Sequence, residues 1–323
     1  MRWAFSVVRQ FKLLDQQEHY DVMMSRVMPV NGHLAGWLIK CIRPKIKWIV
    51  YFSDPVWNSP FLKLSLRRTD DHRPNWLLMK VFGIPAKWAV RKGDLLVFNN
   101  ERLARFVLGG RYERYREKIV IAPYGHEGVH PRPAPQRGDG KFRLTHVGQL
   151  YGSRTLKAVI GGAALLKQQR PELYERLSIR QVGFASETEK RRVRESEVAE
   201  AFEFVGQVPY EQSVEEMYQA DCLLVIDPVF DRAEKNIYIP GKLYDYISTG
   251  RPIFCIADED SATGDVAKKL GCTRVDGRDA AAVSRQLVQM VQGRAPEPAS
   301  GAPPELLCDY GVAILDNKIG ELV

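Results

Sequence analysis

The sequence predicts an α/β fold of two domains, each built on a doubly wound parallel sheet. Short apolar runs alternate with stretches of helical periodicity along most of the chain, which is the pattern of parallel β-α-β units. A length of 323 residues with 45% hydrophobic residues is enough for two cores. A Pro- and Gly-rich cluster at 131–140 separates the two halves and is typical of a semi-rigid interdomain linker. The evenly spaced strand-helix units of a single α/β barrel are not evident.

The first domain is expected over residues 1–130. Its strands are short runs dominated by apolar residues, and its helices have apolar residues at helical spacing. Residues 74–90 also have helical spacing, but Gly83 and Pro85 interrupt it, so we expect a pair of short helices there at most. The other expected elements are a helix at 4–16, a strand at 21–25, a helix at 33–41, strands at 47–52 and 94–98, a helix at 100–108 and a strand at 118–123.

The second domain is expected over residues 141–300, where the alternation of strands and helices is more regular. Its strands are expected at 142–147, 177–182, 202–205, 222–226, 253–257 and 273–275. Its helices are expected at 155–169, 187–199, 211–220, 241–250, 262–270 and 280–291. Residues 295–304 are rich in Pro and Ala and are expected to cross the surface. The last segment, 301–323, is then expected to pack back on the first domain.

Positive charge is concentrated in the first part of the chain. The net charge is +8, and residues 1–140 carry 24 Lys and Arg against 12 Asp and Glu. All the tryptophans lie in the same part, at Trp3, Trp37, Trp48, Trp57, Trp76 and Trp88. Basic residues interleaved with Trp suit an anionic membrane surface or an acceptor that carries phosphates. An ordinary basic surface with core tryptophans explains the pattern equally well. We do not expect a nucleic-acid partner, because no binding motif or basic stripe is present.

The cysteines and the hydropathy pattern indicate the compartment. The five cysteines lack Cys-x-x-Cys spacing and read as reduced structural thiols in a cytoplasmic protein without zinc. No uncharged apolar run is long enough to span a bilayer, and the start of the chain has too short an apolar stretch for a signal peptide. We therefore expect peripheral contact, if any, at the cytoplasmic face of the inner membrane.

The most informative stretch runs from Ile237 through the helix that ends near Gly250. Pro240 suits the first turn of a helix, Gly250 suits a left-handed exit, and Pro252 stops the helix before an apolar strand. The start of such a helix offers backbone N–H groups to a phosphate, with Lys242 beside them. Asp245, about one turn further on, can accept hydrogen bonds from a ribose. The pattern therefore predicts a cradle for a nucleoside diphosphate.

The block Pro-Gly-Lys-Leu-Tyr-Asp-Tyr-Ile-Ser-Thr-Gly-Arg-Pro resembles the nucleotide-sugar segment of GT-B glycosyltransferases of the retaining "group 1" family. The resemblance extends to 145–154 and to 202–226, and covers about residues 141–275. It implies two Rossmann-like domains with the donor cleft between them. It also implies transfer of a sugar from a nucleoside-diphosphate sugar, such as a UDP- or GDP-sugar, with retention and without a metal or another cofactor. The acceptor expected is a membrane-linked glycan or a growing polysaccharide, and the basic, Trp-rich first domain is what suggests the membrane.

The same resemblance assigns roles to individual residues. Arg154 takes the place of the basic residue that grips the donor phosphates, and Lys242 stabilises the diphosphate leaving group. Gly148 and Gly152 let the backbone approach the donor closely. Backbone groups of Val208 read the edge of the nucleobase, those of Gly241 and Leu243 meet the phosphates, and Asp245 contacts the ribose. A solvated surface position remains the alternative for Lys242 and Arg154, and a plain turn for Val208.

Two departures from the family pattern affect the donor sugar and the acceptor. The family has a pair of glutamates; Asp245 is one methylene shorter than the second, and the first falls at Ile237. Nearby acidic residues are Asp227, Asp231 and Glu234, for which capping is the plainer explanation. The first domain is also short relative to the family, so the acceptor side is expected to be built differently.

In the first domain, Asp54 follows the expected strand at 47–52 and is a candidate catalytic residue that binds an acceptor hydroxyl. An ordinary Asp-Pro turn is the alternative. His33 is expected in a loop that faces the cleft, although lone histidines are more often structural. We expect even less of His126 and His146.

A GT-B-like subunit without activity, serving as a partner in a polysaccharide assembly complex, is the main alternative to an enzyme. The short first domain and the missing first glutamate favour it, whereas an intact set of Arg154, Lys242 and Asp245 argues against it. A sugar-nucleotide epimerase on the same fold fits less well, because its acid and base carboxylates cannot be assigned. Walker loops, nucleophile elbows and zinc-protease motifs are not present in the sequence.

Overall fold

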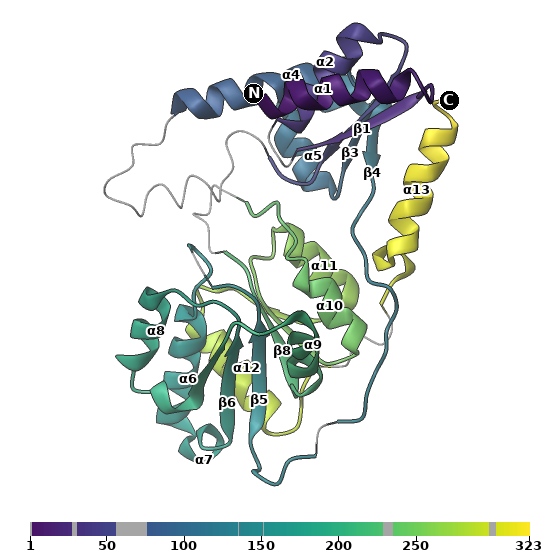
Figure 1. The fold of residues 1–323 in the computed structure, drawn as a ribbon. Helices are drawn as coiled ribbons and strands as arrows, with labels where there is room; N and C mark the ends of the chain where they lie inside the picture. The colour runs from purple at the N-terminus through teal and green to yellow at the C-terminus, as the bar shows by residue number, and fades with distance from the viewer. Residues whose placement is uncertain are drawn as a thin grey trace. The chain divides into compact units, whose positions relative to one another are not determined.

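A computed structural model of the chain describes residues 2–27, 31–55, 76–134, 136–150, 152–228, 235–296 and 302–323, without the side chains of 76–82. The chain forms two compact units (Figure 1). The N-terminal unit consists of residues Met1–Gly125 together with Cys308–Val323, and the C-terminal unit of His126–Leu307. The expectations for Asp231 and Glu234 fall outside the described residues, and so does part of the surface crossing expected at 295–304.

The N-terminal unit holds a four-stranded parallel sheet in the order β1-β2-β3-β4. Strand β2 is an almost continuous apolar run, and it is buried on both faces, as in parallel sheets covered by helices. The elements of this unit are α1 (Arg2–Asp15), β1 (Val22–Arg26), α2 (Gly32–Ile42), β2 (Lys47–Phe52), α4 (Trp76–Lys92), β3 (Leu95–Phe98), α5 (Glu101–Leu108), β4 (Ile119–Ile121) and α13 (Cys308–Gly320).

Helix α4 differs from the prediction. Residues Trp76–Lys92 form one helix that contains Pro85, where we expected a pair of short helices at most. A proline inside a helix removes one hydrogen bond and clashes with the preceding turn. Here packing outweighs that cost, because Ala86 and Ala89 are buried and Trp88 stacks on Trp37 of α2, with ring centroids 4.3 Å apart.

Helix α13 packs on one face of the N-terminal sheet. Ile314, Leu315 and Ile319 of the helix, and Leu322 just after it, pack on a cluster formed by β2, β3 and β4. Gly311 lies so close to the Pro123 carbonyl oxygen that an added Cβ would come within 2.3 Å of it. The segment after Leu307 is therefore part of the N-terminal unit.

The C-terminal unit holds a six-stranded parallel sheet in the order β10-β9-β8-β5-β6-β7. Its elements are β5 (Phe142–Val147), α6 (Lys157–Gln169), α7 (Pro171–Tyr174), β6 (Leu177–Val182), α8 (Glu187–Arg194), β7 (Phe202–Gly206), α9 (Tyr210–Tyr218), β8 (Cys222–Ile226), α10 (Lys242–Thr249), β9 (Ile253–Ile256), α11 (Ala262–Leu270), β10 (Thr273–Val275) and α12 (Ala280–Val291). Helix α8 ends earlier than predicted, and a 3₁₀ turn at Ala199–Ala201 follows it.

The strand order reverses between β5 and β8. From β5 the chain moves outward through β6 and β7, and it then returns to β8 and moves the other way through β9 and β10. Helices α6 and α12 pack together on one face of the sheet, and α9, α10 and α11 cover the other (Figure 1). In open parallel sheets, ligands bind at the carboxyl ends of the strands where the order reverses. The expected position of a ligand is therefore beside the ends of β5 and β8.

The predicted linker at 131–140 is packed against the C-terminal unit. Arg132 forms an ion pair with Glu215 and lies over the Tyr218 ring, 3.8 Å from its centroid. The His130 amide donates to the Ser248 carbonyl at 2.7 Å. These contacts explain why the division between the units falls at Gly125. None of the described helices is long and apolar enough to cross a membrane.

Candidate functional site

The start of helix α10 is held beside the carboxyl ends of the strands of the C-terminal sheet. Gly241 caps its start, and Gly250 ends it at φ +67°, in the left-handed region predicted from the sequence. The helix buries Leu243, Tyr246 and Ile247. The Tyr246 hydroxyl accepts a hydrogen bond from the Val147 amide at 2.8 Å, which ties the helix to the end of β5. The first residue of the helix, Lys242, is thereby held beside that strand.

The ammonium group of Lys242 lies across the end of β5. Its Nζ is 2.8 Å from Nε2 of His146, which is fully buried on β5. Gly148 follows β5 at φ +135°, and a Cβ there would lie 2.2 Å from Nζ. Only a residue without a side chain therefore leaves room for the lysine in this position.

The loop that carries Arg154 is fixed by contacts with the neighbouring β6–α8 region. The Leu150 amide donates to the Phe184 carbonyl at 2.8 Å. The Leu156 amide donates at 2.9 Å to the carboxylate of Glu189, a side chain that is 3% exposed on α8. Arg154 lies between these two anchors and is partly buried.

Arg154 and Lys242 are close enough for their charges to interact. Burial, and next the Arg154 cation, lowers the pKa of Lys242 to about 7, while Asp227 opposes this shift. Two cations held together in a partly buried site repel each other unless an anion joins them. Such an arrangement is typical of a site that binds a phosphate or diphosphate.

Asp227 supplies the acidic group of this cluster. It directly follows β8 and is 2% exposed, so burial raises its pKa to about 6. Its carboxylate accepts hydrogen bonds from Asn236 at 2.6 Å and from Thr263 at 2.9 Å, which favour the charged form. The cluster of Arg154, Lys242 and Asp227 thus surrounds the point where the strand order reverses.

A row of three glycines continues from this cluster along the sheet edge. Gly148, Gly183 and Gly206 stand at the carboxyl ends of β5, β6 and β7, all with positive φ. The Gly148 amide donates to the Val182 carbonyl, and the Gly183 amide donates to the Gly206 carbonyl, both at 2.7 Å. At Gly206 an added Cβ would meet nothing within 4 Å. The row provides a surface of bare backbone that a ligand can approach closely.

Comparisons with known proteins identify the fold. Neither a family model nor a curated protein sequence matches the chain. Among solved structures, the lipopolysaccharide outer core galactosyltransferase WaaB in its apo form has a TM-score of 0.65 at 13% identity, over 99% of this chain and 80% of that one. The chain has the GT-B fold. A trehalose-phosphate synthase from Burkholderia xenovorans, solved with glucose-6-phosphate, also gives a TM-score of 0.65, at 11% identity over 99% of this chain and 77% of that one. The pneumococcal O-GlcNAc transferase GtfA, solved with UDP and GlcNAc, gives 0.64 at 12% identity over 98% and 59%.

The C-terminal unit brings most of the predicted donor-binding residues to one sheet edge. Gly152 and Val208 lie in the loops after β5 and β7, and Asp245 lies on α10, where burial raises its pKa. One detail differs from the prediction. The Leu243 amide donates to the Pro240 carbonyl at 3.0 Å, so it is already engaged at the helix start. The lysine side chain is therefore the main cationic group that this segment presents.

In the N-terminal unit, the helix expected at 33–41 is confirmed, but the placement of His33 in a loop was wrong. His33 lies in the first turn of α2, not in a loop, and it is fully buried. Its Nδ1 is 2.9 Å from Ser25 Oγ, and its ring is 4.9 Å from that of Phe52. Asp54 lies in the loop after β2 and is partly buried, and its catalytic role remains a prediction.

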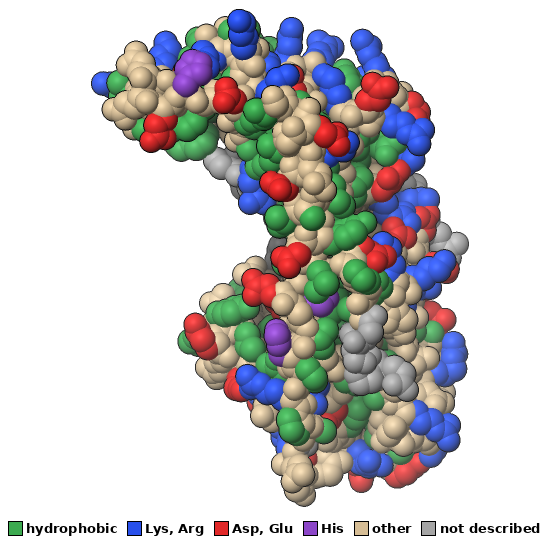
Figure 2. Space-filling model, turned by 90° about the vertical axis from the view of Figure 1, so that its right-hand side faces the viewer, with side chains coloured by type: hydrophobic (Ala, Val, Ile, Leu, Met, Phe, Trp, Pro, Cys, Tyr) green, Lys and Arg blue, Asp and Glu red, His purple; other side chains and the backbone are tan. Residues whose placement is uncertain are grey.

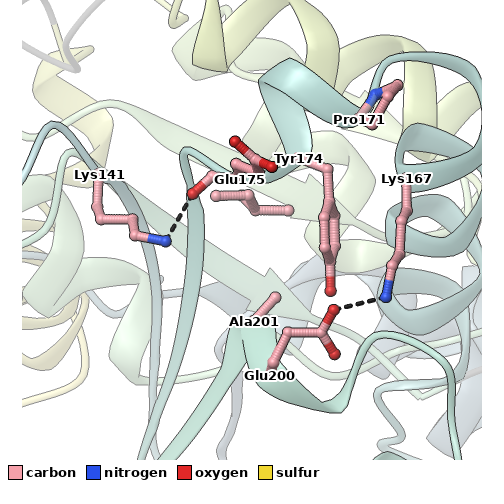
Figure 3. A pocket seen from close by; sticks show the side chains of 8 residues that line it. Lys141, Lys167, Pro171, Tyr174, Glu175, Glu200 and Ala201 are labelled. Atoms are coloured by element: carbon pink, nitrogen blue, oxygen red, sulfur yellow. Dashed lines mark hydrogen bonds and ion pairs between the residues drawn. The ribbon is translucent and has the colours of Figure 1, made fainter.

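A cavity of about 500 Å³ lies elsewhere in the C-terminal unit (Figure 3). It is lined by Lys141, Leu177 and Ala201, which stand at or next to the amino ends of β5, β6 and β7. Its charged groups already bind protein atoms: Lys141 donates to the Glu175 carbonyl and Lys167 to Glu200, both at 2.6 Å. This cavity is at the opposite edge of the sheet from Lys242.

Sequence reasoning missed His146, Gln181 and Tyr246 as parts of the site. A signal for two of them existed, because His146 and Gln181 are polar residues one position before the ends of their strands, each next to a terminal valine. They also pair in register between β5 and β6. Within the described residues, no three or more His, Cys, Asp and Glu side chains are grouped as metal ligands.

Proposed function

We propose that this chain is a glycosyltransferase that moves a sugar from a nucleoside-diphosphate sugar to an acceptor hydroxyl. The observation that carries the proposal is the pairing of Arg154 and Lys242 beside the glycine row, where the strand order reverses. Breaking the bond between the anomeric carbon and the phosphate leaves negative charge on the departing diphosphate. Fixed cations stabilise that charge more in the transition state than in the ground state, which is what raises the rate.

The other residues of the edge have roles that follow from their positions. The diphosphate at Lys242 lies at the end of β5 and Gly206 at the end of β7, which are two strand spacings apart, or about 10 Å. That distance suits the ribose and base of a nucleotide, so we place the base near Gly206 and Val208. Asp245 accepts hydrogen bonds from the ribose hydroxyls, and Gly152 and Gly241 leave room for the phosphates.

UDP is the first nucleotide to test, and GDP the second. The similar structure of GtfA holds UDP and GlcNAc, and a structure of TarM was also solved with UDP. We propose that the sugar is transferred with retention and without a metal, with Asp54 binding the acceptor hydroxyl. The anomeric configuration of the product by NMR tests retention. Full activity in excess EDTA tests metal independence, and an unchanged KM for the acceptor in Asp54→Asn would remove that residue from the site.

The decisive experiment compares nucleotide binding by wild type and Lys242→Met. Loss of a cation that contacts phosphate should weaken UDP or GDP binding by more than tenfold, measured by calorimetry and by thermal protection. Lys268→Met is the matched control, because Lys268 is exposed in the last turn of α11. A wild-type protein that binds no nucleoside diphosphate at millimolar concentration would contradict the proposal.

One observation favours the second candidate, an inactive partner subunit of a polysaccharide assembly complex. Ile237 occupies the place of the first family glutamate and is 4% exposed, so this position supplies no carboxylate to a donor sugar. A subunit of this kind would retain nucleotide binding and lack turnover. A panel of nucleotide sugars, assayed for both hydrolysis and transfer, separates it from the enzyme.

We further propose a membrane-linked glycan or polysaccharide acceptor and peripheral contact with the cytoplasmic face of the inner membrane. Lys and Arg side chains gather at the upper margin of the N-terminal unit in Figure 2. On α1, Trp3 and Phe5 are 48% and 59% exposed next to basic residues, whereas Trp48 is buried in the core. The exposed basic residues of α1, α4 and the loop before β2 are Arg2, Arg9, Lys12, Lys45, Lys87, Arg91 and Lys92. Co-sedimentation with anionic but not neutral vesicles, reduced in a Trp3→Ser/Phe5→Ser variant, tests this contact.

A further inference from the structure

A chain of buried hydrogen bonds runs from the backbone of the sheet edge to Lys242. Gln181 Nε2 lies 2.7 Å from the Gly148 carbonyl oxygen and 3.2 Å from that of Val182. Gln181 Oε1 lies 2.5 Å from His146 Nδ1, and His146 Nε2 lies 2.8 Å from Lys242 Nζ. The side chains of His146 and Gln181 are 0% and 1% exposed.

The donors and acceptors in this chain can be assigned without ambiguity. Carbonyl oxygens only accept, so the group of Gln181 that faces them is its NH₂ and the group that faces His146 is its oxygen. The imidazole must then carry its proton on Nδ1 and donate it to Gln181 Oε1. Nε2 is left with a lone pair, which accepts a hydrogen bond from Lys242.

The imidazole remains neutral in this environment. The titratable and charged groups that act on it are Lys242 from α10 and Arg154 from the β5–α6 loop, and both are cations. Burial and these cations together keep the pKa of His146 well below its usual value. Asp227 interacts with Lys242 and Arg154 and is the acidic member of the group.

We propose that His146 is a positioning residue: its neutral ring, oriented by Gln181, holds the amino group of Lys242 over Gly148, where it meets the donor diphosphate. This inference rests on the proposed function. One N–H of Lys242 is directed to His146, which leaves the other donors of the ammonium for phosphate oxygens. A flexible four-carbon side chain is thereby held in one place before the donor arrives, which lowers the ordering cost of binding.

The role of His146 can be tested by removing its hydrogen-bond acceptor, the Nε2 lone pair, while keeping most of the volume of the side chain. His146→Leu removes the lone pair, so UDP affinity should fall about tenfold at pH 6.5, below the pKa of about 7 of Lys242. The pH at which UDP binding is half lost should also move downward by about one unit, because a lysine without its acceptor loses its proton more readily. His146→Gln places an amide oxygen within reach of Lys242 and should restore the midpoint and most of the affinity.

Controls separate positioning from simple disturbance of β5. Thr145→Val alters the adjacent buried residue of the same strand and should leave both the affinity and the pH midpoint unchanged. Gln181→Leu removes the group that selects the tautomer and should reduce the affinity about threefold. Wild-type UDP affinity and an unshifted midpoint in His146→Leu would overturn the positioning role while leaving the glycosyltransferase proposal intact. A wild type without nucleotide binding would instead remove the proposed function.

A measurement on the unliganded protein tests the same chain of hydrogen bonds directly. In ¹⁵N-histidine-labelled protein at pH 7, the ring of His146 should show the neutral tautomer with the proton on Nδ1. In Gln181→Leu the signal should shift toward the Nε2–H tautomer. An Nε2–H tautomer or an imidazolium in the wild type would overturn the inference.

Discussion

Two fully buried histidines, one in each unit, differ in whether a ring nitrogen contacts a charged side chain. Nδ1 of His33 pairs with Ser25, which also accepts a hydrogen bond from the Trp48 indole, and the ring lies against Phe52. Nδ1 of His146 pairs with Gln181, and its Nε2 meets Lys242. Burial lowers the pKa of both, that of His33 to about 3. Burial therefore does not distinguish a structural histidine from one that supports a site; a cation at the strand end does.

The largest expected effect is on the rate of sugar transfer, when one of the cations near His146 is removed. Arg154→Met removes a group that can hold two phosphate oxygens, and sugar transfer should fall by a factor of about 10² to 10³. Initial rates with a saturating donor measure this effect. Arg285→Met, at an exposed position on α12, is the control and should retain wild-type rates. A loss below threefold in Arg154→Met would place this arginine outside the reaction.

Gly148→Ala should displace the lysine without unfolding the protein. The new Cβ meets the far end of a flexible side chain, so Lys242 swings away from His146 and UDP affinity falls by about tenfold or more. The alanine also adopts a strained φ of +135°, which costs about 1–3 kcal/mol. Gly271→Ala also places an alanine at a positive φ, +64°, with nothing within 4 Å of the new Cβ, and should bind UDP normally. Calorimetry on both variants makes the comparison.

Lys242→Met should stabilise the empty protein while it weakens nucleotide binding. The folded-state pKa of Lys242 is about 7 and its unfolded value is near 10.5, so wild-type folding suffers the full penalty of a buried cation below pH 7. That penalty declines as the pH rises from 7 to about 10.5. The methionine variant should therefore gain about 1–4 kcal/mol at pH 6 and progressively less toward pH 10, measured by urea unfolding. A gain that grows with pH would contradict the assignment.

His33→Ala should produce the smallest effect on the site. It leaves a cavity and an unsatisfied Ser25 in the N-terminal core, so the free energy of unfolding should fall by about 1–3 kcal/mol. The UDP affinity of the folded protein should stay within twofold of wild type, in contrast to His146→Leu. A large loss of affinity would mean that the buried position of His33 conceals a role in the site.

The sequence predicted the parts of the site that local patterns determine. The end of α10 at Gly250 follows from one glycine and one proline, and the parallel sheet follows from the apolar strands between helices. The residues Arg154 and Lys242 were found through their motif. What could not be read from local patterns depends on contacts between distant elements. Asp227 acquires its hydrogen bonds from Asn236 and Thr263, which lie beyond β8 and on α11, and no motif joins these three residues.

The errors have a similar physical origin. The segment around Pro85 stays helical because Trp88 stacks on Trp37 of another helix, a contact that propensity does not include. The sequence favoured His33 over His146 because the pairing of β5 with β6, which places Gln181 beside His146, is not visible in a local pattern. A prediction that combined strand register with polar residues near strand ends would have found this pair.

The glycine row also limits how this protein can diversify under selection for new donors. At Gly183 an added Cβ would lie 2.5 Å from the Gly148 carbonyl oxygen, and backbone atoms cannot rotate away as a lysine tip can. Random libraries should therefore retain glycine at 148 and 183 whatever sugar is supplied. A change in donor preference will therefore require substitutions of the side chains that surround this edge, and those positions are the ones to vary in engineering.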